Sequence, residues 1–320
     1  MSGDIRIAGE RPIPTHIRRS IYCLSIDDPA LADKAYASWA DAIVLDVARK
    51  PGADWQQDLK TRMPAAIHAA ARGGAEVFAR VSGAAAELGA VVFDGLTGVV
   101  LRGVEDAEQM AQAGERLAAL EDERGIASGS LEIDVDITTA AGVWNALAIA
   151  RATPRFGTFT IDERALSCNL GMTTEPHEAF EPLEYIKSEI ITVAISAGGQ
   201  AQGMSYPLSM TQHDPGAAEL AKAVRRARDT GFKGAVCPHV SWIRACNEGF
   251  RPSPQETAYY VKVREVFAEG LKRGMASVPI DGKMIDVPVD IRARLYLDWA
   301  ARAKARDEAK ARAHGQEVNA

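Results

Sequence analysis

Two acidic side chains and one hydroxyl side chain alternate with apolar residues along one strand-like run near the middle of the chain. Asp134, Asp136 and Thr138 are two residues apart, so they share one face of the predicted strand, with Thr138 at its carboxyl end. Carboxylates in such a place can transfer protons or hold a divalent cation. Without a partner they would be costly to bury, so we expect Asp134 and Asp136 to contact Arg80 or Arg155.

The elements around this run form a predicted strand–helix–strand unit. An alternating apolar run over 131–137 is followed by a segment with helical spacing and by a second strand-like run over 158–161. This order is typical of a right-handed parallel crossover, in which the loops at the carboxyl ends of the strands carry the reactive groups. Thr138 and residues 162–165 occupy those loops.

Similar alternations of strand and helix patterns cover most of the chain. They predict strands over 20–24, 42–47, 76–81, 98–101, 131–137, 158–161, 200–204 and 234–237. This repetition favours a TIM-type (β/α)8 barrel over an open doubly wound sheet. We divide the chain into an N-terminal arm (1–17), the barrel (18–250) and a C-terminal helical extension or lid (251–320), whose charged end we expect to fray in solvent.

The composition argues against several classes of function. The 320 residues are 47% hydrophobic and 25% charged with a formal net charge of −6, so we expect neither nucleic acid nor an anionic membrane as a partner. The sequence has no apolar stretch as long as a spanning helix, and its first 20 residues do not resemble a secretory signal. The four cysteines form no CxxC pair, which favours reduced thiols and a cytoplasmic protein.

Short sequence pieces occur in a fixed order along residues 18–300. They are RS at 19–20, ADAIVLD at 40–46, RV at 80–81, GVVL at 98–101, VE at 104–105, TAAGVWNA at 139–146, PR at 154–155, NLG at 169–171, GFKGAVCPH at 231–239, NEGFRPSP at 247–254 and DGKMIDVPV at 281–289. In this order and spacing, the chain resembles the citrate lyase β-subunit-like branch of the HpcH/HpaI aldolase superfamily.

The resemblance implies a TIM-type barrel, usually a homotrimer, that makes or breaks a carbon–carbon bond next to a carboxylate or CoA thioester. Citryl-, malyl- and citramalyl-CoA are the typical substrates. It also implies a Mg²⁺ ion that absorbs the charge of an enolate and an arginine that binds the substrate carboxylate.

The resemblance assigns four substrate-binding residues: Arg80, Arg19, Asp46 and Thr138. Arg80 matches the arginine that binds the substrate carboxylate, and Arg19 also lies at a matching position. A structural ion pair is the alternative for both. Asp46 matches the first acid of the family's LDLED run, whose other two acids are absent here.

Two acids match positions that imply catalysis. Glu105 matches an acid at the start of the helix after the fourth strand, where compensation of the helix dipole is the alternative. Asp286 matches an acid in a C-terminal segment that reaches a neighbouring subunit's site in relatives. An N-cap is its alternative role.

The metal ligands of the family do not match. Its glutamate aligns with Thr138, its aspartate with Ala165, and a lysine after the fourth strand with Gly103. A hydroxyl and a methyl group cannot hold Mg²⁺, which prefers charged oxygens. Asp136 and Glu163 are the possible substitutes.

Three functions follow from these observations. The first is a divergent carbon–carbon lyase acting on a small hydroxy-carboxylate or its CoA thioester. The second is a metal-free binding protein or pseudoenzyme of the same fold. The third is an acyl-CoA thioesterase, because attack by water needs a base and an oxyanion site but no metal.

Overall fold

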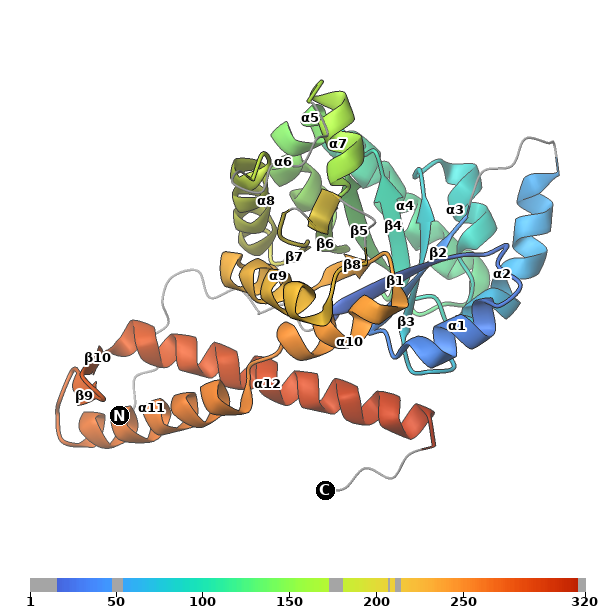
Figure 1. Ribbon diagram of the computed structural model, residues 1–320. Helices are drawn as coiled ribbons and strands as arrows, with labels where there is room; N and C mark the ends of the chain where they lie inside the picture. The colour runs from blue at the N-terminus through green and yellow to red at the C-terminus, as the bar shows by residue number, and fades with distance from the viewer. Residues whose placement is uncertain (1–15, 48–53, 173–180, 207, 211–213, 316–320) are drawn as a thin grey trace.

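Eight parallel strands form a nearly closed barrel at the centre of the molecule (Figure 1). The computed structural model describes residues 16–47, 54–172, 181–206, 208–210 and 214–315. The strands lie in the order β7-β6-β5-β4-β3-β2-β1-β8. Their bounds are β1 (Ser20–Ser25), β2 (Ala42–Asp46), β3 (Glu76–Val81), β4 (Gly98–Arg102), β5 (Glu132–Ile137), β6 (Phe156–Ile161), β7 (Gln200–Gln202) and β8 (Ala235–Cys237).

Two backbone hydrogen bonds join the ends of this sheet. The Lys233 amide donates to the Ala201 carbonyl at 3.0 Å, and the Gly203 amide donates to the Gly234 carbonyl at 2.9 Å. The predicted TIM-type barrel is therefore confirmed. All the predicted strands are present, with bounds shifted by no more than two residues.

Helices connect the strands and cover the outside of the barrel (Figure 1). Side-chain caps begin several of them, such as Asp106 for α4 and Thr139 for α5, as their residue types favour. None of the described helices is long and apolar enough to cross a membrane. They are α1 (Leu31–Ser38), α2 (Trp55–Ala71), α3 (Ala85–Val91), α4 (Ala107–Arg124), α5 (Ala140–Trp144), α6 (Ala146–Arg151), α7 (Glu163–Asn169), α8 (Glu184–Ser196), the short 3-10 helix η1 (Leu208–Met210), α9 (Ala217–Thr230) and α10 (Val240–Gly249).

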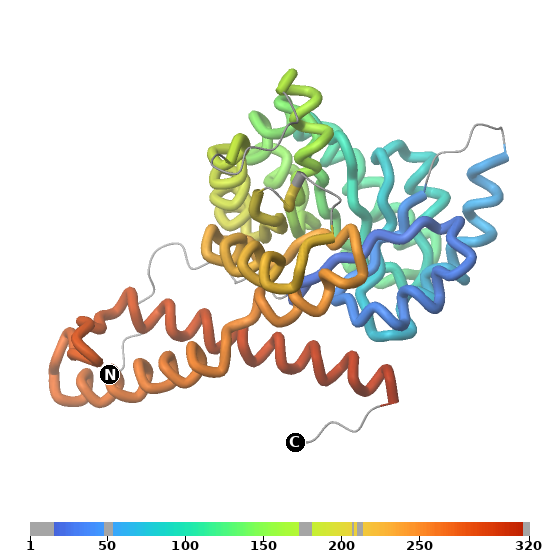
Figure 2. The backbone as a smooth tube through the Cα atoms, in the orientation of Figure 1, coloured from blue at the N-terminus to red at the C-terminus, as the bar shows by residue number. Residues whose placement is uncertain are grey.

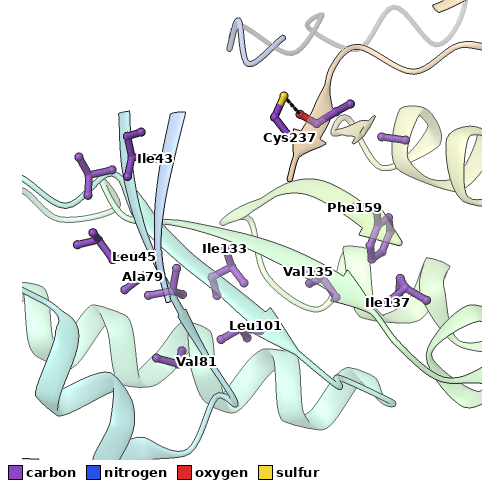
Figure 3. Packing of buried hydrophobic residues seen from close by; sticks show 14 of the residues in the cluster. Ile43, Leu45, Ala79, Val81, Leu101, Ile133, Val135, Ile137, Phe159 and Cys237 are labelled. Carbon is purple, nitrogen blue, oxygen red and sulfur yellow. Dashed lines mark hydrogen bonds between the residues drawn. The ribbon is translucent and has the colours of Figure 1, made fainter. Parts of the chain in front are cut away.

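The hydrophobic core lies between the strands and the helices. Alternate strand residues such as Leu45, Ile133 and Phe159 face outward and are buried under the helices (Figure 3). Burying each large apolar side chain stabilises the fold by about 1.5–3 kcal/mol. The residues between them face the barrel interior, where Val44 and Phe78 belong to a second apolar cluster. Polar residues that continue this inward series therefore line the mouth at the carboxyl ends of the strands.

The chain after the barrel forms a long helical extension (Figures 1 and 2). It consists of α11 (Pro254–Lys272), the antiparallel strands β9 (Val278–Ile280) and β10 (Lys283–Ile285), and α12 (Val287–Ala313). A separate small core that includes Val263, Phe267 and Ile285 holds it together.

The charged end of α12 packs against the barrel. The Lys310 side chain is buried and donates to Asp41 Oδ1 at 2.5 Å and to the Trp39 carbonyl at 2.9 Å. The ring of His314 stacks on the ring of Trp39, with 3.9 Å between the ring centroids. Burial alone would raise the pKa of Asp41, but Arg19 and Lys310 beside it lower the pKa. The expectation that this helix frays is wrong as far as residue 315, because its charges have buried partners.

The ends of the proposed domains remain predictions. Residues 1–15 of the N-terminal arm lie outside the described residues, and the boundaries at 17/18 and 250/251 are not tested. The four cysteines are free thiols, as expected for reduced side chains.

Candidate functional site

Side chains from five strands meet at the mouth of the barrel. Arg80 on β3 donates from Nη2 to the Sγ of Cys23 on β1 at 3.3 Å. Its Nη1 lies 3.7 Å from Asp46 Oδ2 on β2, and its Nε lies 3.8 Å from Asp136 Oδ2 on β5. Asp136 also accepts a 2.9 Å hydrogen bond from the Thr160 hydroxyl on β6. The structure thus brings together three residues singled out in the sequence, and the expected contact between Asp136 and Arg80 is present.

Arg80 lacks a short bond to any described carboxylate. Both of its ion pairs are longer than the 2.7–2.9 Å typical of a charge-assisted hydrogen bond. Its buried Nε has no hydrogen-bond partner among the described residues. Arg19, by contrast, binds the two oxygens of Asp41 at 2.7 and 3.0 Å. The Arg80 guanidinium therefore keeps donors available for a ligand.

Burial sets the protonation of the mouth. It raises the pKa of Asp136 above its usual range, although Arg80 and Thr160 favour the charged form. It also raises the pKa of Cys23, which keeps this thiol neutral and poorly nucleophilic. Burial lowers the pKa of Arg80, but the neighbouring carboxylates of Asp136 and Asp46 oppose this effect, and the pKa is raised overall. The mouth therefore holds a permanent cation beside a carboxyl group that gains a proton more readily than usual.

A second ion pair crosses the mouth, and it was missed from the sequence. Arg102 ends β4, and its Nη2 donates to Asp162 Oδ2 at 2.5 Å. Asp162 follows β6, and its Oδ1 accepts a 3.0 Å hydrogen bond from the Ala165 amide at the start of α7. The signal was available, because Val100 faces inward and Arg102 is the next inward-facing residue of the same strand.

The two positions that the resemblance matches to the family's metal ligands carry no charge. Thr138 follows β5, and its hydroxyl lies close to Gly103, since a Cβ atom added to Gly103 would be 3.7 Å from Thr138 Oγ1. Ala165 lies in the first turn of α7, where its amide is bonded to Asp162. A role for Thr138 in binding substrate stays a prediction.

Glu163, the possible substitute ligand, is engaged elsewhere. It is buried, lies 3.0 Å from Lys187 Nζ through Oε1 and accepts a 2.7 Å hydrogen bond from the Ser209 hydroxyl through Oε2. Burial raises the pKa of Glu163 even though Lys187 favours its charged form. Nothing in the described structure joins Glu163 to Asp136. Across the described ranges, no group of three or more histidine, cysteine or acidic side chains is placed to hold a metal ion.

Arg19 lies at the opposite end of the barrel from this mouth. It precedes β1, is fully buried, and binds Asp41 and also Asp307 of α12, the latter at 2.5 Å. The expectation that Arg19 binds substrate is corrected, because its donors are occupied by buried carboxylates. The alternative, a structural ion pair, is what the structure shows.

The two predicted catalytic acids occupy different regions. Glu105 is exposed on the loop between β4 and α4, at the mouth end of the barrel, where Asp106 rather than Glu105 caps the helix. Asp286 lies in the extension, where its Oδ1 accepts a 3.2 Å hydrogen bond from the Val289 amide and caps α12. The structure therefore does not bring these two acids together within one chain, and their catalytic roles stay predictions.

Comparison with known proteins agrees with this architecture. The family described as HpcH/HpaI aldolase/citrate lyase matches residues 19–240. The citrate lyase subunit beta of Escherichia coli (strain K12) is 25% identical over 299 residues, which cover 92% of this chain and 97% of that protein. The mitochondrial citramalyl-CoA lyase of Rattus norvegicus is 24% identical over 176 residues, which cover 52% of this chain and 50% of that protein.

Solved structures show the same fold at low identity. CitE from Mycobacterium tuberculosis, in complex with magnesium, acetoacetate and coenzyme A, aligns with a TM-score of 0.62 and 22% identity over 90% of this chain and 99% of its own. A citrate lyase from Burkholderia xenovorans LB400 aligns with a TM-score of 0.68 and 15% identity over 94% of this chain and 93% of its own. The resemblance read from the sequence is confirmed.

Proposed function

Because this chain belongs to the HpcH/HpaI aldolase/citrate lyase family, we propose that it is a carbon–carbon lyase. Its substrate is a small hydroxy-carboxylate or the CoA thioester of one, of the malyl-, citramalyl- or citryl-CoA kind. The names of the relatives support this substrate class. The observation that carries the proposal is the Arg80 guanidinium, which faces the barrel mouth without a hydrogen-bonded carboxylate.

In this mechanism Arg80 binds the substrate carboxylate with two parallel hydrogen bonds and holds the scissile bond in the mouth. Asp136 takes the proton from the substrate hydroxyl, whose oxygen becomes a carbonyl as the carbon–carbon bond breaks. The electron pair of that bond passes to the other fragment as an enolate. The same proton then returns to the enolate carbon, which leaves a 2-oxo acid and a shorter acyl-CoA, with Asp136 again a carboxylate.

The residues offered for Mg²⁺ do not fit that ion. Magnesium requires near-octahedral oxygen ligands, usually with charged carboxylates among them. Thr138 and Ala165 provide none, and Glu163 is bound by Lys187 and Ser209. We therefore assign no step of this reaction to a metal.

The remaining sequence predictions complete the proposal. Asp46 helps to orient Arg80, and Glu105 faces the substrate from the loop after β4. Asp286 acts at the site of a neighbouring subunit in a homo-oligomer, which is a trimer or a multiple of one. The protein works in the cytoplasm and binds neither nucleic acid nor membranes.

The test is an assay of the purified chain with malyl-, citramalyl- and citryl-CoA, with products identified by mass spectrometry. We expect cleavage to a 2-oxo acid and a shorter acyl-CoA, and we expect it to persist in excess EDTA. Free CoA with an intact hydroxy acid would indicate the thioesterase instead. Binding without turnover would indicate the binding protein, and cleavage lost in EDTA but restored by Mg²⁺ would contradict the interpretation of Thr138 and Ala165.

A further inference from the structure

The ion pair between Arg102 and Asp162 spans the carboxyl end of β5. In the sheet, β5 lies between β4 and β6, which carry these two residues. Arg102 is the register partner of Asp136, and Arg80 is the register partner of Val100 on the neighbouring strand. Because inward-facing residues alternate, Arg102 lies one layer nearer the rim than Arg80 and directly beside Asp136.

Three acids of the mouth lie beside guanidinium groups. Asp46 and Asp136 both face Arg80, and Asp162 uses one oxygen for Arg102 and the other for the backbone amide that begins α7. A divalent cation at the end of β5 would therefore compete with an arginine for each of these carboxylates. The mouth is built around two fixed positive charges.

Arg102 also has capacity for a ligand. Its side chain is 48% exposed, and among the described residues it is bonded only through Nη2. A guanidinium carries five N–H donors, so most of them are unused. Asp162, which is itself fixed by its bond to α7, limits the movement of the group.

We propose that Arg102, held by Asp162, supplies the positive charge that stabilises the substrate oxyanion during cleavage, in the place of a divalent cation. The inference rests on the proposed lyase function. Arg80 binds the carboxylate in the deeper layer, and Arg102 donates to the adjacent hydroxyl oxygen, which gains negative charge when Asp136 takes its proton and loses that charge as the carbon–carbon bond breaks. Donors fixed before the reaction stabilise such charge without the cost of reorganising water. The ligands that fit are small acids with a second oxygen next to the carboxylate, such as 2-oxo and 2-hydroxy acids.

Calorimetric titration with oxalate tests the inference, because oxalate presents one carboxylate to each arginine. The titrations use the full chain in EDTA and then in excess Mg²⁺. Arg102→Gln removes the charge, and Asp162→Asn loosens its position. Arg116→Gln is the matched control, since Arg116 forms an exposed ion pair with Glu123 on the outer surface. Thermal unfolding verifies that each variant is folded.

We expect the wild-type chain to bind oxalate in EDTA and Mg²⁺ to change its affinity less than about threefold. Arg102→Gln should weaken binding about 10- to 100-fold, the effect of one charge-assisted hydrogen bond. Asp162→Asn should have a smaller effect, and Arg116→Gln should have none. Binding that requires Mg²⁺, or wild-type affinity in Arg102→Gln in EDTA, would overturn the inference and leave the lyase proposal standing. Failure of oxalate to bind in either condition would also overturn it, and the cleavage assay then decides whether the lyase proposal survives.

Discussion

Replacement of Arg80 by glutamine removes the cation that faces both Asp46 and Asp136. The Nε–Oδ2 distance to Asp136 is 3.8 Å, which corresponds to about 4 kcal/mol of attraction at an effective dielectric constant of 20. The folded protein loses only part of this energy, because burial already raises the pKa of Asp136 and the uncompensated acid can take up a proton. The cost to stability should therefore be larger at pH 8 than at pH 5.

A bound carboxylate has no such escape. Small carboxylic acids remain ionised at neutral pH, so loss of their charged partner in a buried site costs about 2–5 kcal/mol. This corresponds to a loss of affinity between roughly 30-fold and several thousand-fold. Arg80→Lys should fall between the two, because an ammonium keeps the charge but not the two parallel hydrogen bonds.

The assay is calorimetric titration of acetoacetate into the wild type, Arg80→Gln, Arg80→Lys and the surface control Arg116→Gln. Thermal unfolding of each protein at pH 5 and pH 8 measures the cost to stability. Acetoacetate bound equally well by Arg80→Gln and the wild type would refute the assignment, and Arg80 would then be a structural residue of the barrel.

Two further predictions concern the scaffold. Glu121 binds both Nη atoms of Arg155 at 2.7 and 2.6 Å, and although burial opposes the charge, this pairing lowers its pKa from 4.5 to about 2. The pair should add about 3 kcal/mol to the free energy of unfolding above pH 4.5, and this contribution should disappear as the pH falls toward 2. In urea unfolding, Glu121→Gln should therefore destabilise the protein at pH 7 but not at pH 2. Asp41→Asn should cost about 3–5 kcal/mol, because it leaves Arg19 and Lys310 buried without their acid. Hydrogen exchange should then accelerate in the last turns of α12, and unchanged protection there would contradict the docking role of Asp41.

The barrel could be predicted because its signal is local. Outward-facing strand residues such as Leu45, Ile133 and Phe159 form apolar runs that alternate with helical patterns, and each run marks its own strand. The same alternation places Arg80 and Asp136 at the mouth. It would also have placed Arg19 correctly, because a residue before the first strand lies at the end of the barrel opposite the mouth.

The features that were missed depend on partners far away in the sequence. Strand alternation indicates that Arg102 faces the mouth, but it does not indicate the pairing with Asp162, which is 60 positions later. The charged end of α12 resembles a solvated helix until Lys310 meets Asp41. Neither pairing leaves a pattern in the sequence near the charged residue, because the partner that neutralises the charge lies on a distant segment of the chain.

If two arginines hold the substrate at the mouth of this barrel without a divalent cation, no metal ion should bind there together with the substrate. A crystal structure of the protein grown with Mn²⁺ and acetoacetate, with anomalous scattering recorded for manganese, tests this proposal. We expect the carboxylate of acetoacetate to bind Arg80, the pair between Arg102 and Asp162 to stay intact, and the mouth to show no anomalous peak. An ordered Mn²⁺ held by carboxylates at the ends of β5 and β6 would contradict the proposal that the arginines replace a divalent cation.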